Sequence, residues 1–76
     1  MKTAKTLTDL QKFKGFFGMD THREYDSRLE YRVQDLDGSL NAAREIIRKN
    51  NLNVEAKTSG QMAQIRMFEV KEVSNG

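Results

Sequence analysis

The sequence predicts an α+β domain in two layers, a four-stranded, mainly antiparallel sheet with two helices on one face. Two stretches, residues 7–14 and 37–49, repeat apolar residues at helical spacing, and other stretches alternate apolar and polar residues as half-buried strands do. The resulting order αββαββ is the ferredoxin-like order, permuted so that its last helix and strand come first. The 76 residues allow one small domain, and its ends are expected to fray at 1–4 and 74–76.

The first helix is expected from Leu7 to about Lys14. Thr6 precedes it and stands three residues before Asp9, an arrangement in which both side chains can satisfy free backbone amides at a helix start. The apolar side chains of its buried face are Leu7, Leu10 and Phe13. Gly15 is expected to end this helix, whose outer face is cationic.

The first two strands are expected at residues 15–19 and 28–34. The earlier one is a short aromatic run whose flanking glycines suit a bulge or a close backbone approach. Residues 20–27 are polar and connect the two strands. In the later strand apolar side chains occupy every second position, which indicates one buried and one exposed face: Leu29, Tyr31 and Val33.

The second helix is expected to open at residues 37–39, where Asp37 or Ser39 can cap it, and to stop at residues 50–51. Asp35 and Asp37 flank this start and could bind a cation, but capping explains them better. Its inward positions are Leu40, Ala43, Ile46 and Ile47. A third strand is expected at residues 52–57, because apolar and polar residues alternate there.

The last strand is expected from about Met62 to Val73. Its first apolar residues that share a face are Ala63, Ile65 and Met67. The alternation changes phase at Phe68 and Val70, so a bulge or a twist is expected near residues 67–68.

Composition argues against most enzymes. The chain has no cysteine, which excludes disulfides and thiolate chemistry, and it has no phosphate-binding glycine loop, nucleophile elbow or two-metal carboxylate set. His22 lies near Glu24 and Asp26, the residue types of an acid-base or metal site, but one histidine with scattered carboxylates in a polar hairpin is far more often a solvated turn. We therefore expect a non-enzymatic protein without cofactor or metal.

The apolar runs are only two or three residues long, so no membrane span is expected, and we expect a cytoplasmic protein. The net charge of +2 is concentrated at the start of the chain, since residues 1–14 carry +3 and the remainder −1.

The leading functional hypothesis is a small regulatory or inhibitory protein that occupies a surface of a larger protein. The sheet face away from the helices should be open and polar, and Tyr, Arg and Phe are the residue types that contribute most to interfaces. The expected partner-binding residues are Arg23, Tyr25, Arg32, Gln64, Arg66 and Phe68. An edge strand, at residues 52–57 or 15–19, could also pair with its copy in a homodimer. Only the small size indicates an origin in a phage or mobile element.

The alternative hypothesis is nucleic-acid binding. Cationic side chains of the first helix and the sheet would follow phosphates: Lys5, Lys12, Lys14, Arg32 and Arg66. Phe16 or Phe68 would stack on bases. Dependence of affinity on salt separates the two hypotheses, because a phosphate-led complex weakens steeply as salt rises.

A further alternative comes from a family resemblance. Residues 35–40, the helix after them and residues 51–54 resemble the first half of an ACT-type domain, a ferredoxin-like ligand-sensing module of amino-acid metabolism. The resemblance extends over residues 29–70, with Asp37 where that family usually has proline. It implies a pocket that holds an amino acid between paired sheets, close to Asp35, Gly38, Asn51 and Asn53.

Overall fold

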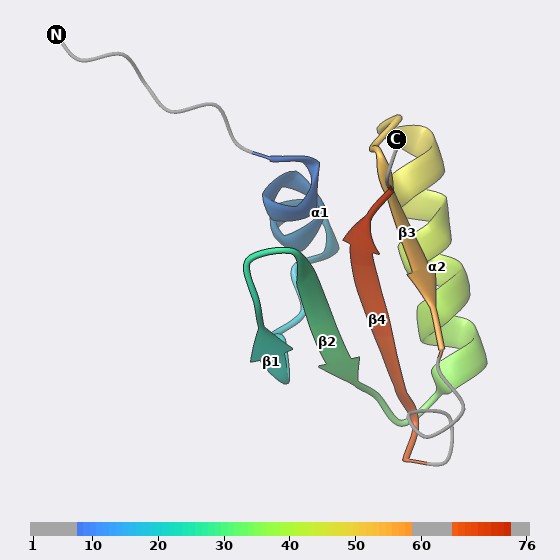
Figure 1. Ribbon diagram of the computed structural model, residues 1–76. Helices are drawn as coiled ribbons and strands as arrows, with labels where there is room; N and C mark the ends of the chain where they lie inside the picture. Colours follow the sequence, from blue (N-terminus) through green and yellow to red (C-terminus); the bar gives the residue numbers. More distant parts are fainter. Residues whose placement is uncertain (1–7, 59–64, 74–76) are drawn as a thin grey trace, which may run out of the picture.

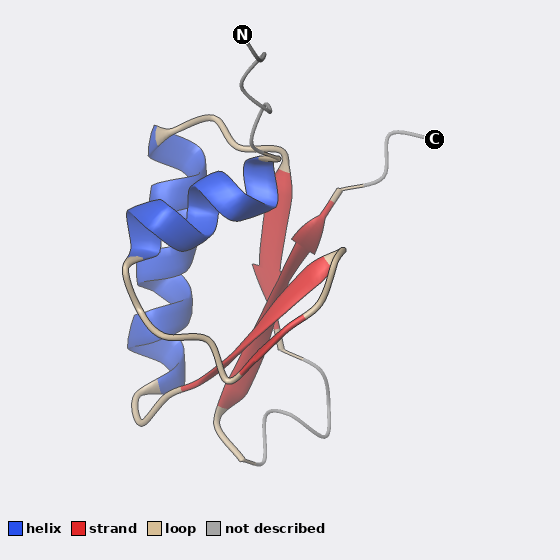
Figure 2. Ribbon diagram, turned by 90° about the vertical axis from the view of Figure 1, so that its left-hand side faces the viewer, coloured by secondary structure: helices blue, strands red, loops and turns tan. Residues whose placement is uncertain are grey.

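The computed structural model describes residues 8–58 and 65–73. In this part of the chain the helices and strands are α1 (Asp9–Phe17), β1 (Arg23–Glu24), β2 (Arg28–Arg32), α2 (Leu36–Lys49), β3 (Val54–Lys57) and β4 (Met67–Glu72) (Figure 1). The strands form one antiparallel sheet, and both helices lie on the same side of it (Figure 2). The predicted two-layer α+β class and the order αββαββ are confirmed.

The strands are arranged β1-β2-β4-β3 across the sheet. Because β4 is antiparallel to both of its neighbours, β2 and β3 run parallel to each other with β4 between them. The unit β2-α2-β3 is therefore a split βαβ unit, and the sheet has the strand order that the permuted ferredoxin-like fold requires. The two edges of the sheet are β1 and β3.

Helix α1 is longer than predicted, and the strand expected at residues 15–19 is wrong. The backbone amide of Gln11 donates to the Thr8 hydroxyl over 3.2 Å at the start of the helix. The helix continues through Gly15 and ends at Gly18, which has a left-handed φ of 71°. The helical spacing also continues, because Phe17 lies four residues after Phe13 and stacks on it at 5.1 Å between ring centroids.

Strand β1 lies instead in the polar segment that was expected to be a connection. It has only two residues, both exposed, so it has no apolar alternation that a sequence pattern could detect. The main-chain amide of His22 donates to the carbonyl of Glu30, and that of Tyr25 donates to the carbonyl of Arg28. The predicted strand at residues 28–34 is observed as the shorter β2, with Leu29 and Tyr31 buried.

Helix α2 forms where it was predicted, and of the residues for which capping was expected only Asp35 has that role. The carboxylate of Asp35 accepts a hydrogen bond from the Gly38 amide over 3.1 Å, so Asp35 caps the helix and neither Asp37 nor Ser39 does. The reason is the earlier helix start at Leu36, which places Gly38 at the third helical position.

Strand β4 differs most from its prediction. Phe68 and Val70 lie opposite Tyr31 and Leu29 and are fully buried on the helix side, whereas Met67 lies on the opposite face of the sheet. The register between β2 and β4 is continuous from residue 67 to residue 71, so the bulge expected near residues 67–68 does not form. Residues 62–64 of the predicted strand lie outside the described residues.

An aromatic cluster joins α1 to the centre of the sheet. Tyr31 packs edge-on against Phe13 and Phe17, with centroids 6.1 Å and 5.1 Å away, and stacks on Phe68 at 5.3 Å. At the far end of the core the Asp9 carboxylate accepts from the Asn53 amide over 2.6 Å. These contacts hold α1 on the sheet beside α2. No helix in the described ranges is long and apolar enough to cross a membrane.

Candidate protein-binding surface on the sheet

The sheet face opposite the helices is a surface of charged side chains. Register places the following strand residues on it: Arg23, Arg28, Glu30, Arg32, Glu55, Lys57, Met67, Glu69 and Lys71. We call this set the open face. Cations and carboxylates are mixed on this face. The strand order β1-β2-β4-β3 places charged residues of neighbouring strands side by side.

Arg28 organises the centre of the open face. Glu30 and Glu69 are directly opposite each other on β2 and β4, an arrangement that brings two like charges together. The Arg28 guanidinium lies 3.2 Å from the Glu30 carboxylate and 3.8 Å from that of Glu69, and Lys71 lies 3.9 Å from Glu69. Glu30 is only 8% exposed, so loss of Arg28 would leave a buried carboxylate without its nearest cation.

Tyr25 covers the outer side of Arg28. The guanidinium carbon of Arg28 lies 4.1 Å from the centre of the Tyr25 ring, within the range of a cation-π contact. Tyr25 is still 38% exposed. Beside it, the interaction with the Tyr25 hydroxyl and then the Glu30 carboxylate raise the pKa of Arg23 above its usual value. We call Arg23, Tyr25 and Arg28 the Tyr25 cluster.

Arg32 and Arg66, both predicted to bind a partner, lie together at the end of the sheet. They line a hollow of about 470 Å³ with Val33, Gln34 and Ile65. Arg66 has a positive φ of 57°, and its carbonyl accepts from the Val33 amide over 2.9 Å. Ile65 is 55% exposed, which adds an apolar side chain to this end of the surface.

Two other predicted partner-binding residues do not belong to the observed surface. Phe68 was expected on the open face but is 0% exposed, because it packs on Tyr31 and Phe17 on the helix side. It can therefore contact neither a protein partner nor a nucleic-acid base without unfolding of the core. Gln64 lies outside the described residues.

The cations proposed for nucleic-acid binding do not form one surface. Lys12 and Lys14 are on α1, in the helix layer, where they pair with Asp9 at 3.9 Å and with Glu24 at 2.7 Å. Arg32 and Arg66 are at the far end of the sheet layer. Lys5 lies outside the described residues. An unbroken path of phosphate contacts would need these groups on one side of the molecule.

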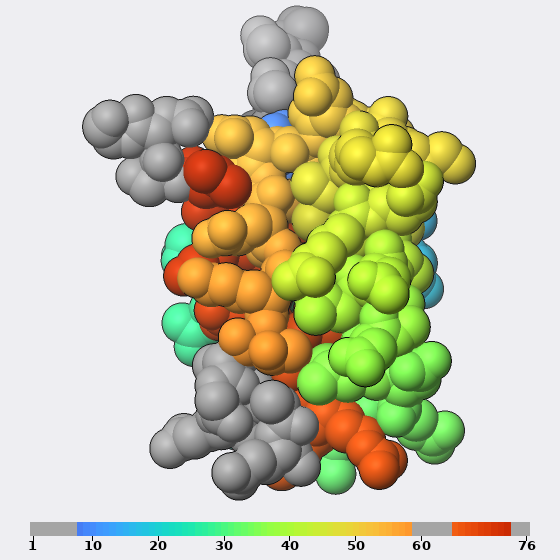
Figure 3. Space-filling model, turned by 90° about the vertical axis from the view of Figure 1, so that its right-hand side faces the viewer, coloured from blue at the N-terminus to red at the C-terminus, as the bar shows by residue number. Residues whose placement is uncertain are grey.

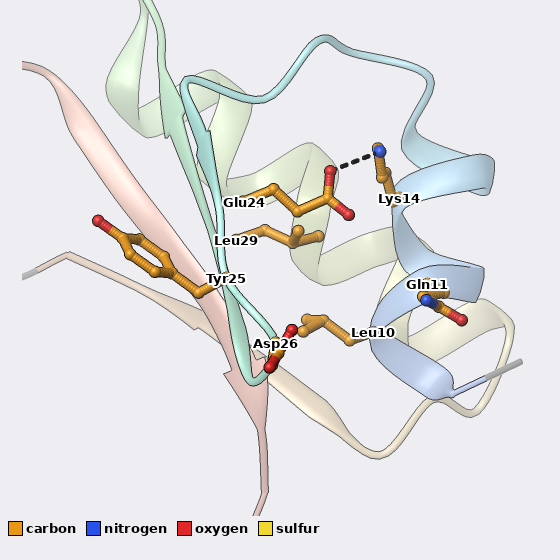
Figure 4. Close-up of a pocket in the computed structure, with 7 residues that line it drawn as sticks. All are labelled: Leu10, Gln11, Lys14, Glu24, Tyr25, Asp26 and Leu29. Carbon is orange, nitrogen blue, oxygen red and sulfur yellow. Dashed lines mark hydrogen bonds and ion pairs between the residues drawn. The ribbon is translucent and has the colours of Figure 1, made fainter.

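A small hollow of about 320 Å³ lies between α1 and the β1-β2 hairpin (Figure 4). The Lys14-Glu24 ion pair bridges it, with Leu10 and Leu29 below, while the Tyr25 ring points away to the other side of the sheet. Glu24, one of the residues considered with His22 for an acid-base site, has its carboxylate engaged by Lys14. Within the described ranges no three His, Asp or Glu side chains lie close enough to hold a metal ion.

The residues named for the ACT-type pocket lie at the two ends of α2. Asp35 and Gly38 form the capped start of the helix, and Asn51 and Asn53 follow its last turn. A helix of 14 residues is about 20 Å long, so these pairs do not meet within one chain.

Comparisons with known proteins do not assign this chain to a family. No family model, no curated protein and no solved structure matches the chain. The surface just described is therefore interpreted from its own geometry.

Sequence reasoning named Arg23, Tyr25 and Arg32 but missed Arg28 as a site residue. The sequence pattern placed Arg28 in the strand expected at residues 28–34 but gave it no role in the site. Its role depends on Glu69, which is 41 positions away in the chain and becomes its neighbour through the β2-β4 register. The alternation of charged residues in residues 28–34 is the signal that could have identified it.

Proposed function

We propose that this protein is a non-enzymatic regulatory or inhibitory module that binds a surface of a larger protein through the Tyr25 cluster of its open face. The observation that carries the proposal is the exposed Tyr25 ring stacked on Arg28. Tyr and Arg are enriched among the residues that dominate binding energy, and a ring held by a neighbouring guanidinium loses little conformational freedom on binding.

The surroundings of the cluster suit a protein partner. The Glu30 and Glu69 carboxylates neutralise much of the cationic charge there, so the surface offers donors and acceptors of both signs. A surface of mixed charge favours an oriented protein complex over contact with a uniformly negative phosphate backbone. Lys12 and Lys14, whose charges are paired in the helix layer, also give less support to the nucleic-acid hypothesis.

Affinity capture tests the proposal with a matched pair of aromatic substitutions. Tyr25→Ala removes the ring from the open face, whereas Phe16→Ala removes an exposed ring from α1, where 54% of the Phe16 surface is accessible. The wild type and both variants are immobilised and exposed to lysate of the source cell at about 50 mM and about 200 mM salt, and retained protein and nucleic acid are identified.

The expected result is one protein retained stoichiometrically by the wild type and by Phe16→Ala at both salt concentrations, and at least about tenfold less of it on Tyr25→Ala. Equal retention by all three proteins would refute the role of the Tyr25 cluster. Heterogeneous nucleic acid that is lost at the higher salt would support the nucleic-acid alternative, and a rise in melting temperature with a free amino acid would support the ACT-like sensor.

A further inference from the structure

The outer edge of β3 has backbone groups available for another strand. The amide of Val73 donates to the carbonyl of Asn53, so residues 53, 55 and 57 direct their backbone groups toward β4. Val54 and Ala56, which alternate with them, direct their amides and carbonyls away from the sheet. The Ala56 carbonyl confirms this direction, because it accepts from the Arg44 side chain of α2 over 3.1 Å.

A groove runs along this edge between β3 and α2 (Figure 3). Its volume is about 470 Å³, and its apolar part is formed by Ile47, Val54 and Ala56. The side chains of β3 that face the helix layer, Val54 and Ala56, are short and leave room for a neighbouring strand at this edge. Ala56 is the smallest of them and lies in the middle of the exposed edge.

The charges on the other face of β3 are complementary to themselves. Glu55 and Lys57 flank Ala56, and in one chain they lie 3.8 Å apart with each about half exposed. If two β3 strands pair antiparallel with Ala56 opposite its own copy, each Glu55 lies opposite Lys57 of the second chain. This register also places Val54 opposite Thr58, and it makes Ala56 a hydrogen-bonded pair, as the direction of its backbone groups requires.

We propose that β3 is the interface with a second copy of this chain, and that the two sheets join into one eight-stranded sheet about a two-fold axis at Ala56. Glu55 and Lys57 then form non-hydrogen-bonded cross-strand pairs, the closer of the two kinds of pair in an antiparallel sheet. The two-fold axis doubles every such contact, because the same patch serves both chains.

Among the described residues, the cations Arg44 and Arg48 line this groove, and Arg44 is the one that contacts the edge of β3. Its guanidinium lies near the axis, so two like charges approach each other in the dimer. Each carbonyl has two lone pairs, so the Ala56 oxygen can keep its bond to Arg44 and accept the amide of the second chain. In the proposed dimer the four charges of the Glu55-Lys57 pairs meet directly across the axis and offset this repulsion.

Charge reversal at β3 tests the proposal by sedimentation equilibrium over a range of protein concentrations. Glu55→Lys and Lys57→Glu each replace two attractive cross-strand pairs with two repulsive ones, and each should weaken dimerisation about tenfold or more. The double variant Glu55→Lys/Lys57→Glu restores opposite charges across the axis and should dimerise as the wild type does. Asp20→Lys makes a similar change of charge before β1, at the other edge of the sheet, and should have no effect.

Circular dichroism confirms that each variant is folded. A wild type that is monomeric at every concentration tested would overturn the proposal, as would a dimer that all four variants leave unchanged or a double variant that fails to recover. Tyr25→Ala should leave dimerisation unchanged, because the Tyr25 cluster is beside β1, so this interface and the proposed protein-binding function can fail separately.

Discussion

Replacing Tyr31 with Phe should stabilise the protein. The Tyr31 side chain is completely buried in the aromatic cluster, and its hydroxyl has no hydrogen-bond partner among the described residues. A buried polar group without a partner costs about 1–3 kcal/mol, while the phenyl ring of Phe keeps the contacts with Phe13 and Phe68. We expect Tyr31→Phe to raise the free energy of unfolding by about 1 kcal/mol at neutral pH.

The same hydroxyl should make stability depend on alkaline pH. Burial, and then the charge of Glu24, raise the Tyr31 pKa from 10.0 to about 12. The unfolded state therefore releases this proton at lower pH than the native state does, and stability falls between about pH 10 and pH 12. A shift of about two pKa units corresponds to a loss of roughly 1.4 kcal/mol at pH 11 and about 2.7 kcal/mol well above pH 12.

Urea denaturation followed by far-UV circular dichroism measures both effects at neutral pH and at about pH 11. The stability difference between Tyr31→Phe and the wild type should grow by about 1.4 kcal/mol between these pH values. Tyr25→Phe is the control, since it removes an exposed phenol and should leave the wild-type pH dependence in place. A Tyr31→Phe protein that is less stable at neutral pH, or a difference that stays constant with pH, would refute the reasoning.

Two further predictions concern the helices, and both are measured as changes in the urea midpoint. Gly15→Ala should stabilise the protein by about 0.5–1 kcal/mol, because Gly15 is inside α1 with open space beside it, whereas Gly18→Ala should destabilise it by about 1 kcal/mol at a positive φ. Equal effects at the two glycines would contradict the helix end at Gly18. Asp35→Ala should cost about 1 kcal/mol by removing the cap of α2, and Ser39→Ala should change stability by less than about 0.5 kcal/mol. A larger loss of stability for Ser39→Ala than for Asp35→Ala would show that Ser39 caps the helix instead of Asp35.

Part of the open face and of its Tyr25 cluster could be predicted from the sequence and part could not. The alternation in residues 28–34 placed Arg32 on an exposed face, and the polar segment before it identified Arg23 and Tyr25 as exposed. The stack of Tyr25 on Arg28 and the bridge from Arg28 to Glu69 were not predicted, because they depend on a hairpin turn and on a register between distant strands. Phe68 was predicted on the open face, and this was wrong because its side also depends on the register between distant strands.

The sequence by itself determined the fold class, helix α2 and strand β2, because their signals are local. Apolar spacing and alternation are patterns of a few consecutive residues, so they can be recognised without knowledge of the rest of the structure. Tertiary structure decided the extent of α1 and the phase of β4. Gly15 is compatible with a helix or a break, and packing of Phe17 on Tyr31 favours the helix. In β4 two sets of apolar residues could face the helices, and the set with Phe68 and Val70 does so because Tyr31 and Leu29 lie opposite it.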